Sequence, residues 1–347
     1  MMKTAVYGAG AMGTVLGAYL ARAGVEADLV SRNGDHVAAL QKGGARIRGW
    51  AAFSVPVRAI PPEEMEGRYG LVILLVKQQD NQAAVERITP FLAPEGVVLT
   101  LQNGIPETAL AETLGEERVL GGIAIWGAAL GEPGTAELTS DPRGMSFSIG
   151  VPWSGPAAAV LERRIPGVKA LLETVCPVTV ETNFTGLRWS KLLVNAAFSG
   201  LSAVSGMSFG EIARGRKSRN CALGIIGECI GVCRAAGVRL PAVQGRDIEK
   251  LLDPRGGLWS ALRARILLPL AVRNHRRIKS GMLGDLDRGR KTEIDAINGE
   301  VSRWGTKYAV PVPLNNAVVD LVHAIERGER RRSPEHFALL WNHRRHR

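Results

Sequence analysis

Short apolar runs alternate with amphipathic helical segments over residues 3–125. Each run has the length of a buried strand, and helical segments with apolar residues every three or four positions separate consecutive runs. The runs are TAVYG, ADLVSR, LVILLVK, GVVLTLQ and RVLGGIAIW, and the helical segments are AMGTVLGAYLARAG, DHVAALQKGG, NQAAVERITPFL and IPETALAETLG. Apolar strands joined by crossover helices are typical of a parallel sheet covered on both faces. The pattern predicts an α/β fold whose N-terminal part is a Rossmann-type, doubly wound parallel sheet.

Further strands and a helix are expected to complete this half. TAELTS and GMSFSIG are strand-like and are separated by a turn at residues 141–144, so both are predicted as antiparallel strands added to the sheet edge. One helix is predicted from AAAVLERR to VKALLET, and a short strand at PVTVET.

From Gly186 onward the strand signals stop, and long segments with helical periodicity follow. They are LRWSKLLVNAAFSGLSAV, SRNCALGIIGECIGVCRAAG, a variable stretch around PAVQGRDIEKLLD, RARILLPLAVRNHRRI, TEIDAINGEVSRWGTKYAV and NNAVVDLVHAIERGE. We therefore expect an α/β domain over 1–182, an all-helical domain over 183–330 and a basic C-terminal tail over 331–347. Two domains with different periodicities are expected to leave a cleft between them.

Composition limits the class of protein. The 347 residues are 46% hydrophobic and 22% charged, which is typical of a folded globular chain. Four cysteines are too few for a disulfide framework, the N-terminus lacks the apolar region of a signal peptide, and no apolar run approaches the ~18 residues of a membrane span. A cytoplasmic protein is expected. Cys229 and Cys233 are expected in the core, and no histidine or cysteine spacing predicts a metal site.

The net charge of +11 indicates an anionic partner. Nine basic residues lie between Arg263 and Lys291, and more follow in the C-terminal segment. No helix-turn-helix, zinc finger or aromatic RNA-binding pattern accompanies them, so nucleic acid is not the expected partner. A solvated helical surface, or attraction of small anionic ligands, accounts for this charge.

A glycine-rich loop follows the first strand and begins a helix. The spacing GxGxxG in this context predicts a dinucleotide site, in which backbone approaches a pyrophosphate at the helix N-terminus. The alternative is a glycine-rich turn without a ligand. The loop residues are Gly8, Ala9, Gly10, Ala11, Met12 and Gly13.

The second strand ends in Ser31 and Arg32. An NAD-specific domain carries an acid at this place to hold the ribose 2′-hydroxyl, whereas an arginine can pair with a 2′-phosphate. Arg32 therefore favours NADPH, with a solvated surface arginine as the alternative.

Polar groups interrupt otherwise apolar elements. Lys191, Asn195 and Ser199 recur every four residues and share one helix face, which is either functional or solvated. Glu293 begins another helix, where it is either functional or an acid stabilised by the helix dipole. Lys77 and Asn103 follow strands of the sheet, where ligands of open α/β folds bind.

Together these segments resemble the ketopantoate reductases (2-dehydropantoate 2-reductases). The resemblance rests on GAGAMG, SRNGDHVAAL, LLVK, LQNG, GGIAIWGAALGEPGTAEL, RWSKLLVNAAFSGLSAV and KTEIDAINGEVSRWGTKYAVPVP, in the order and spacing of that family. It runs from Lys3 to about Gly328.

The resemblance implies NADPH in the first domain and reduction of a 2-oxo acid in the interdomain cleft. It implies that Lys191 is the general acid and that Glu293 binds the hydroxyl group of the substrate. It also implies that Asn195 positions the substrate, that Lys77 and Asn103 lie near nicotinamide and substrate, and that Ala128 contacts the cofactor. Burial should lower the pKa of Lys191, and Glu293 should oppose that shift.

Three positions depart from the family pattern on the substrate side. Ser199 and Phe209 stand where asparagines are usual, and Gly281 stands where a serine contacts the substrate carboxylate, with Ser280 adjacent. Ser199, Ser280 and Gly281 are therefore candidates for substrate binding. These departures leave open which 2-oxo acid is the substrate.

The predicted function is NADPH-dependent reduction of 2-dehydropantoate to pantoate in pantothenate and coenzyme A biosynthesis, with the proton from Lys191. One alternative is reduction of another 2-oxo acid. The other is a regulatory protein that binds NADP(H) without turnover. The sequence leaves open whether the chain is a homodimer and what the C-terminal segment does.

Overall fold

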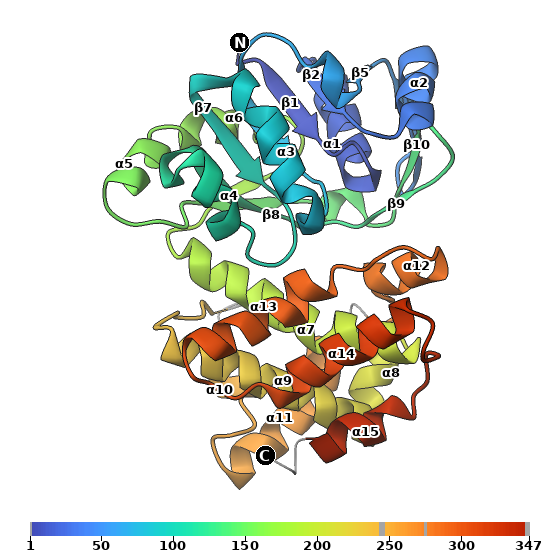
Figure 1. The fold of residues 1–347 in the computed structure, drawn as a ribbon, viewed down its shortest axis with the longest axis vertical. Coiled ribbons are helices and arrows are strands. Elements are labelled where there is room, and N and C mark those ends of the chain that lie inside the picture. Colours follow the sequence, from blue (N-terminus) through green and yellow to red (C-terminus); the bar gives the residue numbers. More distant parts are fainter. Residues whose placement is uncertain (1, 243–246, 274–275, 344–347) are drawn as a thin grey trace. The chain divides into compact units, whose positions relative to one another are not determined.

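A computed structural model describes residues 2–242, 247–273 and 276–343 (Figure 1). The chain divides into two compact units, Met1–Phe184 and Thr185–Arg347. The first unit is mixed α/β and the second is helical, so the predicted fold class is confirmed.

The main sheet of the first unit has eight strands in the order β12-β11-β8-β7-β6-β1-β2-β5. Neighbouring strands are parallel except β11, which is antiparallel to β8 as predicted. From β5 to β8 the order is that of a Rossmann fold, in which the connections reverse beside β1. The strands are β1 (Thr4–Tyr7), β2 (Ala27–Val30), β5 (Arg58–Ile60), β6 (Tyr69–Leu74), β7 (Leu92–Thr100), β8 (Val119–Ala124), β11 (Phe147–Gly150) and β12 (Val178–Val180).

Alternate residues of these strands enter two hydrophobic clusters, one on each face. Val6 and Ile73 pack in the cluster that contains Leu16 of α1 (Ala11–Arg22). Tyr7 and Val72 pack in the opposite cluster, which contains residues of α3 (Asn81–Ile88) and α4 (Glu107–Leu114). Figure 1 shows α3 and α4 together over one face of the sheet. The second strand is followed by α2 (Gly34–Gly43).

A second, four-stranded sheet was not predicted. Its order is β4-β3-β10-β9, and it packs against α1 through buried Ile47 and Leu138. The strands are β3 (Ala45–Gly49), β4 (Phe53–Val55), β9 (Ala128–Leu130) and β10 (Thr135–Leu138). The prediction that TAELTS extends the main sheet is therefore wrong, because β10 pairs in parallel with β3, some 90 residues earlier in the chain.

The single helix expected after β11 is two helices, α5 (Pro156–Glu162) and α6 (Ile165–Glu173). Pro166 explains the break, because proline lacks the N–H that a continuous helix needs and is tolerated in the first turn, where it stands in α6.

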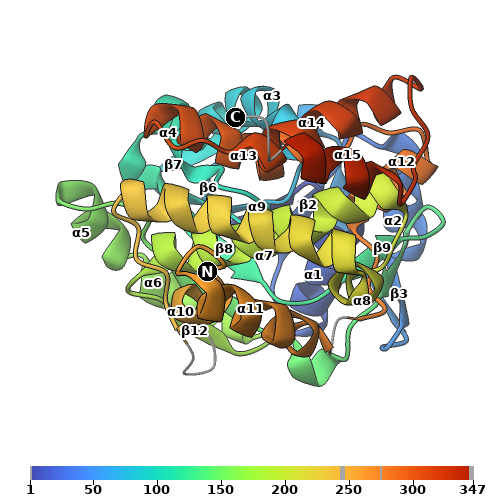
Figure 2. The ribbon, with the colours of Figure 1, turned by 90° about the horizontal axis from the view of Figure 1, so that it is seen from below.

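The second unit is built around α9 (Arg216–Ala235), which contacts most other helices of the unit and carries the buried residues Cys229 and Cys233. Figure 2 shows α9 with α11 on one side and α14 and α15 on the other. The core position predicted for both cysteines is confirmed. The other helices are α7 (Phe184–Ser205), α8 (Phe209–Arg214), α10 (Ile248–Leu252), α11 (Leu258–Ala271), α12 (Gly281–Asp287), α13 (Ile294–Lys307), α14 (Pro313–Glu326) and α15 (His336–His343). Parts of PAVQGRDIEKLLD and RARILLPLAVRNHRRI, at residues 243–246 and 274–275, lie outside the described residues.

A buried polar network joins four of these helices. The carboxylate of Glu228 on α9 accepts hydrogen bonds from the backbone N–H groups of Leu314 and Asn315, at 2.8 and 3.0 Å, and from the Asn315 side chain at 2.7 Å. Asn298 on α13 donates to the Asn315 side chain at 2.9 Å and to the Ala196 carbonyl of α7 at 3.1 Å. A carboxylate at the start of α14 is stabilised by the free N–H groups there.

The C-terminal segment is not a separate tail where it is described. Helix α15 packs against α9 and α14, burying Phe337 and Leu340, and the Phe337 carbonyl accepts a contact from the Cys221 thiol at 3.7 Å. Two apolar positions three apart on a short helix explain this packing. Residues 344–347 lie outside the described residues.

The exposed surface includes an apolar face of α11, formed by Leu258, Trp259, Leu262, Ile266 and Leu270. No helix within residues 2–242, 247–273 and 276–343 combines the length and apolarity needed to cross a membrane.

Candidate functional site

The glycine-rich loop connects β1 to α1 in the geometry of a phosphate-binding turn. Gly8 has a φ of 104°, and a Cβ there would lie 2.6 Å from the Val76 backbone nitrogen. A Cβ on Gly13 would overlap the Gly8 carbonyl oxygen, so the third glycine allows α1 to approach the strand. Around Gly10, in contrast, nothing lies within 4 Å of a would-be Cβ. The open space is therefore at the one glycine where a pyrophosphate needs backbone approach.

The N-terminus of α1 suits an anion. Its N-cap residue is Gly10, which has no side chain that could cap the helix, and the first turn contains no acid. The N–H groups of Ala11, Met12 and Gly13 belong to this first turn, where helices lack internal acceptors. The loop residues therefore fit a dinucleotide, which the sequence predicts for them.

A pocket of about 220 Å³ lies at the carboxyl ends of β1, β2 and β6. Arg32 lines it directly after β2, where a 2′-phosphate would be expected. Its Nη2 atom forms an ion pair at 2.8 Å with Oδ2 of Asp80, at the end of the 3-10 helix Gln78–Asp80 after β6. The other lining residues are Tyr7, Pro62, Glu63, Val76, Ala83, Ala84 and Arg87.

Lys77 and Asn103 lie at the ends of adjacent strands, as predicted, and both are half-buried. Gln78 donates from Nε2 to the Asn103 carbonyl at 2.5 Å, which ties the two strand ends together. Gln102 donates to the Val76 carbonyl at 2.7 Å and to the Asn81 side chain at 2.6 Å. These glutamines fix the backbone that carries the predicted residues.

Ala128 begins β9 in the second sheet. It is half-buried and packs against the same hydrophobic cluster as Met12 of the glycine loop. The second sheet, which was not predicted, therefore positions Ala128 on the side of α1.

In the helical unit, α7 carries Lys191, Asn195 and Ser199 at intervals of four residues. All three side chains are half-buried, whereas Leu192, Ala196 and Phe198 on other faces are buried. The stripe is therefore neither in the core nor fully solvated.

Glu293 is the N-cap residue of α13 and makes no side-chain capping bond, so its carboxylate does not close the helix end. The pKa of Lys191 is lowered to about 8. Desolvation is the largest cause, the like charge of Arg188 adds to the lowering, and the charge of Glu293 opposes both. Both effects expected for the Lys191 pKa, from burial and from Glu293, are present, and burial prevails.

Ser280 is buried and caps α12, because its hydroxyl accepts a hydrogen bond from the Leu283 N–H at 3.1 Å. The Ser280 N–H donates to the Ser202 hydroxyl of α7 at 3.3 Å. Gly281 is the first residue of α12, and nothing lies within 4 Å of a Cβ built on it. Phe209 packs against Phe198 of α7, with ring centroids 5.3 Å apart.

The sequence analysis missed four polar residues of these sites: Arg188, Gln78, Gln102 and Asp80. Arg188 could have been found, since it lies three residues before Lys191 on one helix and therefore on a neighbouring surface. The roles of the other three depend on contacts between separate strand ends, which periodicity does not indicate.

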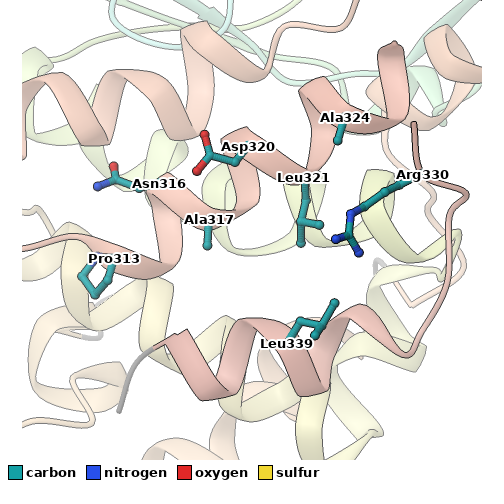
Figure 3. Close-up of a pocket in the computed structure, with 8 residues that line it drawn as sticks. All are labelled: Pro313, Asn316, Ala317, Asp320, Leu321, Ala324, Arg330 and Leu339. Carbon is teal, nitrogen blue, oxygen red and sulfur yellow. The ribbon is translucent and has the colours of Figure 1, made fainter. Parts of the chain in front are cut away.

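A larger cavity of about 480 Å³ lies between α14 and α15 (Figure 3). Asp320 and Arg330 line it together with apolar residues such as Leu321 and Leu339. It contains none of the predicted site residues, so it is separate from the candidate active site. Among the described ranges, no group of three or more His, Cys, Asp or Glu side chains could hold a metal ion.

The first unit has a Rossmann-type strand order with a glycine-rich turn after β1, and the helical unit has a lysine whose pKa is lowered; both are typical of nicotinamide-dependent oxidoreductases. A family model described as Ketopantoate reductase PanE/ApbA matches residues 4–150, and one described as Ketopantoate reductase PanE/ApbA C terminal matches residues 183–326. The chain belongs to the ketopantoate reductase family, as the motifs indicated, and is an oxidoreductase.

Individual relatives agree. A 2-dehydropantoate 2-reductase of Mesorhizobium japonicum is 30% identical, covering 94% of this chain and 99% of that protein. The crystal structure of a PanE/ApbA family ketopantoate reductase from Ralstonia eutropha JMP134 is 31% identical, with a TM-score of 0.77 and coverage of 94% and 99%. The ternary structure of D-mandelate dehydrogenase with NADH and anilino(oxo)acetate has a TM-score of 0.79 against this chain. The two sequences are 24% identical, so this similarity concerns the fold only.

Proposed function

We propose that this protein reduces 2-dehydropantoate to pantoate, with NADPH as its cofactor. The observation that carries the proposal is the lowered pKa of Lys191 beside Glu293, on the helix face where the family motif requires an acid. We propose that the reaction belongs to pantothenate and coenzyme A biosynthesis in the cytoplasm. The free, buried cysteines fit a reducing compartment.

The cofactor would be held by residues of the first unit. The loop from Gly8 to Gly13 would hold the pyrophosphate, Arg32 the 2′-phosphate, and Lys77, Asn103 and Ala128 the nicotinamide end. When bound, the reduced nicotinamide supplies the hydride that the substrate carbonyl carbon accepts.

Lys191 supplies the proton. Hydride addition places negative charge on the substrate oxygen, and the Nζ ammonium of Lys191 donates a proton to that oxygen, forming the 2-hydroxy acid and a neutral amine. A pKa of about 8 makes the ammonium a stronger acid than an ordinary lysine, while it stays largely protonated at neutral pH. Solvent then reprotonates the amine.

Glu293 and Asn195 would orient the substrate. The Glu293 carboxylate, whose charge acts on Lys191, would accept a hydrogen bond from the substrate hydroxyl, and the Asn195 amide lies one turn from Lys191 on the same face. The negative charge of Glu293 also keeps Lys191 protonated at higher pH than burial alone would allow.

A different 2-oxo acid is the second candidate. It is favoured by the packing of Phe209 against Phe198, which replaces a polar position with an apolar one. The hydroxyl of Ser280 already caps α12, which leaves fewer polar groups for the substrate carboxylate. Ser199 and Gly281 would then border a bulkier, more apolar substrate.

The test follows the loss of NADPH absorbance with a panel of 2-oxo acids that includes 2-dehydropantoate. We expect the highest kcat/KM for 2-dehydropantoate; a higher value for a bulkier acid supports the second candidate. NADPH binding without oxidation by any acid would instead indicate a regulatory protein.

The matched variants are Lys191→Ala and Lys217→Ala, the latter at an exposed lysine of α9. Lys191→Ala should reduce kcat by at least about 100-fold with little change in NADPH affinity, because general acid catalysis typically contributes that much. Lys217→Ala should leave kcat unchanged. Near-normal turnover by Lys191→Ala would remove this lysine from the mechanism.

A further inference from the structure

The ion pair between Arg32 and Asp80 lies inside the pocket proposed for the cofactor ribose. The atoms are 2.8 Å apart, and the side chains are 62% and 29% exposed, so the arginine is accessible while the acid is largely covered. Arg32 follows β2 and Asp80 follows β6, the two strands on either side of β1. Both therefore meet at the point where the order of the sheet reverses.

Asp80 forms this ion pair instead of a helix cap. It occupies the N-cap position of α3, where an aspartate commonly accepts a hydrogen bond from the first turn, yet its side chain makes no capping bond. The Asp80 carboxylate is instead directed to Arg32, with which it forms the ion pair.

The pocket as a whole is electrically balanced. Two arginines, Arg32 and Arg87, and two acids, Glu63 and Asp80, line it, and all four act on the hydroxyl of Tyr7, whose pKa is raised mainly by burial. A 2′-phosphate carries close to two negative charges at neutral pH. Such a group gains from Arg32 only after Arg32 separates from Asp80, and it then lies near an uncompensated carboxylate.

We propose that Asp80 is a specificity-determining residue that narrows the preference for NADPH over NADH. The proposal rests on the proposed dinucleotide function of this site. A cofactor without the 2′-phosphate leaves the Arg32–Asp80 pair intact, and its ribose hydroxyls can donate to the Asp80 carboxylate, as they do to the acid of an NAD site. A cofactor with the 2′-phosphate takes Arg32 from Asp80.

The variant that tests this is Asp80→Asn. It removes the charge while keeping the size, and asparagine is as good an N-cap residue as aspartate, so α3 is preserved. The matched control is Glu64→Gln, which removes one charge from a nearby residue that does not line the pocket. A third protein combines Arg32→Gln with Asp80→Asn.

The probes are adenosine 2′,5′-bisphosphate and adenosine 5′-monophosphate, which differ in the 2′-phosphate, with affinities measured by calorimetry on the full chain. Asp80→Asn should raise the ratio of bisphosphate to monophosphate affinity by about three- to fivefold, the size expected for an exposed ion pair. Glu64→Gln should leave the ratio unchanged, and the double variant should lose the gain because the gain depends on Arg32.

An unchanged ratio in Asp80→Asn, or an equal rise in Glu64→Gln, would overturn the proposal. Absence of binding by either nucleotide to the unaltered protein would also overturn it, because no dinucleotide site would then exist. These outcomes do not depend on turnover, so failure of the proposed reaction with every 2-oxo acid is a separate result.

Discussion

At the scale of single residues, the environment of Lys191 determines its chemistry. Its charged form is disfavoured by burial and by Arg188 and favoured by Glu293, which leaves the pKa at about 8. An ordinary lysine would remain charged through the whole physiological range and would be a weaker acid. The composition of the helix indicated the direction of this shift, but the sequence could not give the balance, because that depends on distances between α7 and α13.

The pH dependence expected of the proposed reaction follows from this balance. Proton donation needs the ammonium form, so kcat/KM for reduction should be level below pH 8 with respect to this group and fall about tenfold per pH unit above it. Glu293→Gln removes the group that raises the pKa, so the fall should begin at lower pH. A pH profile of kcat/KM measures both.

The control for that profile is Asp295→Asn, on the same helix. Asp295 forms an exposed pair with His323, with closest atoms 3.1 Å apart, and does not act on Lys191. Its removal should not move the alkaline limb. A limb that stays in place in Glu293→Gln as well would mean that a group other than Lys191 titrates.

Substitutions at two glycines of the loop should affect nucleotide binding and fold stability differently. A methyl group at Gly10 meets open space, so Gly10→Ala should leave thermal unfolding nearly unchanged while weakening dinucleotide binding by about tenfold or more, because it occupies the place of the ligand. A methyl group at Gly13 overlaps the Gly8 carbonyl, so Gly13→Ala should destabilise the fold by about 1–3 kcal/mol. Denaturant unfolding and nucleotide titration of both variants test this contrast, and equal stability losses would contradict it.

At the scale of elements, most strands of the main sheet could be predicted because they are continuous apolar runs separated by segments with helical periodicity. The edge strand β5 was missed, because it is three residues long. The second sheet could not be predicted, because β3, β4, β9 and β10 are three to five residues long and pair across large sequence distances. The same limit applies to the candidate site. The glycine loop is contiguous and was predicted, whereas Asp80 belongs to the site only through the geometry of β2 and β6.

Helix α15 was not predicted from the sequence, because the basic residues around it suggested a tail. Its basic neighbours made residues 331–347 resemble a solvated tail, yet Phe337 and Leu340 are buried against the unit. Phe337→Ala should lower the free energy of unfolding by about 3–5 kcal/mol, the usual cost of removing a buried aromatic ring. Thermal and denaturant unfolding measure the loss.

The matched change for that measurement is Leu339→Ala, since Leu339 lies on the same helix but is 44% exposed. It should cost much less than Phe337→Ala. Equal small losses for the two variants would show that α15 does not contribute to the core.

At the scale of the whole molecule, the charge of +11 is only partly explained. Arg32 and Lys191 are assigned to anionic ligands, but Arg32 is already paired with an acid in the structure. The proposed substrate and cofactor are both anions, so a general positive field would speed their approach without defining either site. The remaining charge has no assigned partner.

The network around Glu228 determines how the helical unit opens. Separating α14 from α9 would remove three hydrogen-bond donors from the buried Glu228 carboxylate, and separating α13 from α7 would break the bond between Asn298 and the Ala196 carbonyl. Since none of these helices can detach without that penalty, they should open together. Hydrogen exchange should therefore give one shared free energy of opening for the slowest-exchanging amide protons of α7, α9, α13 and α14, and α9, which bears Glu228, should be no more labile than α14.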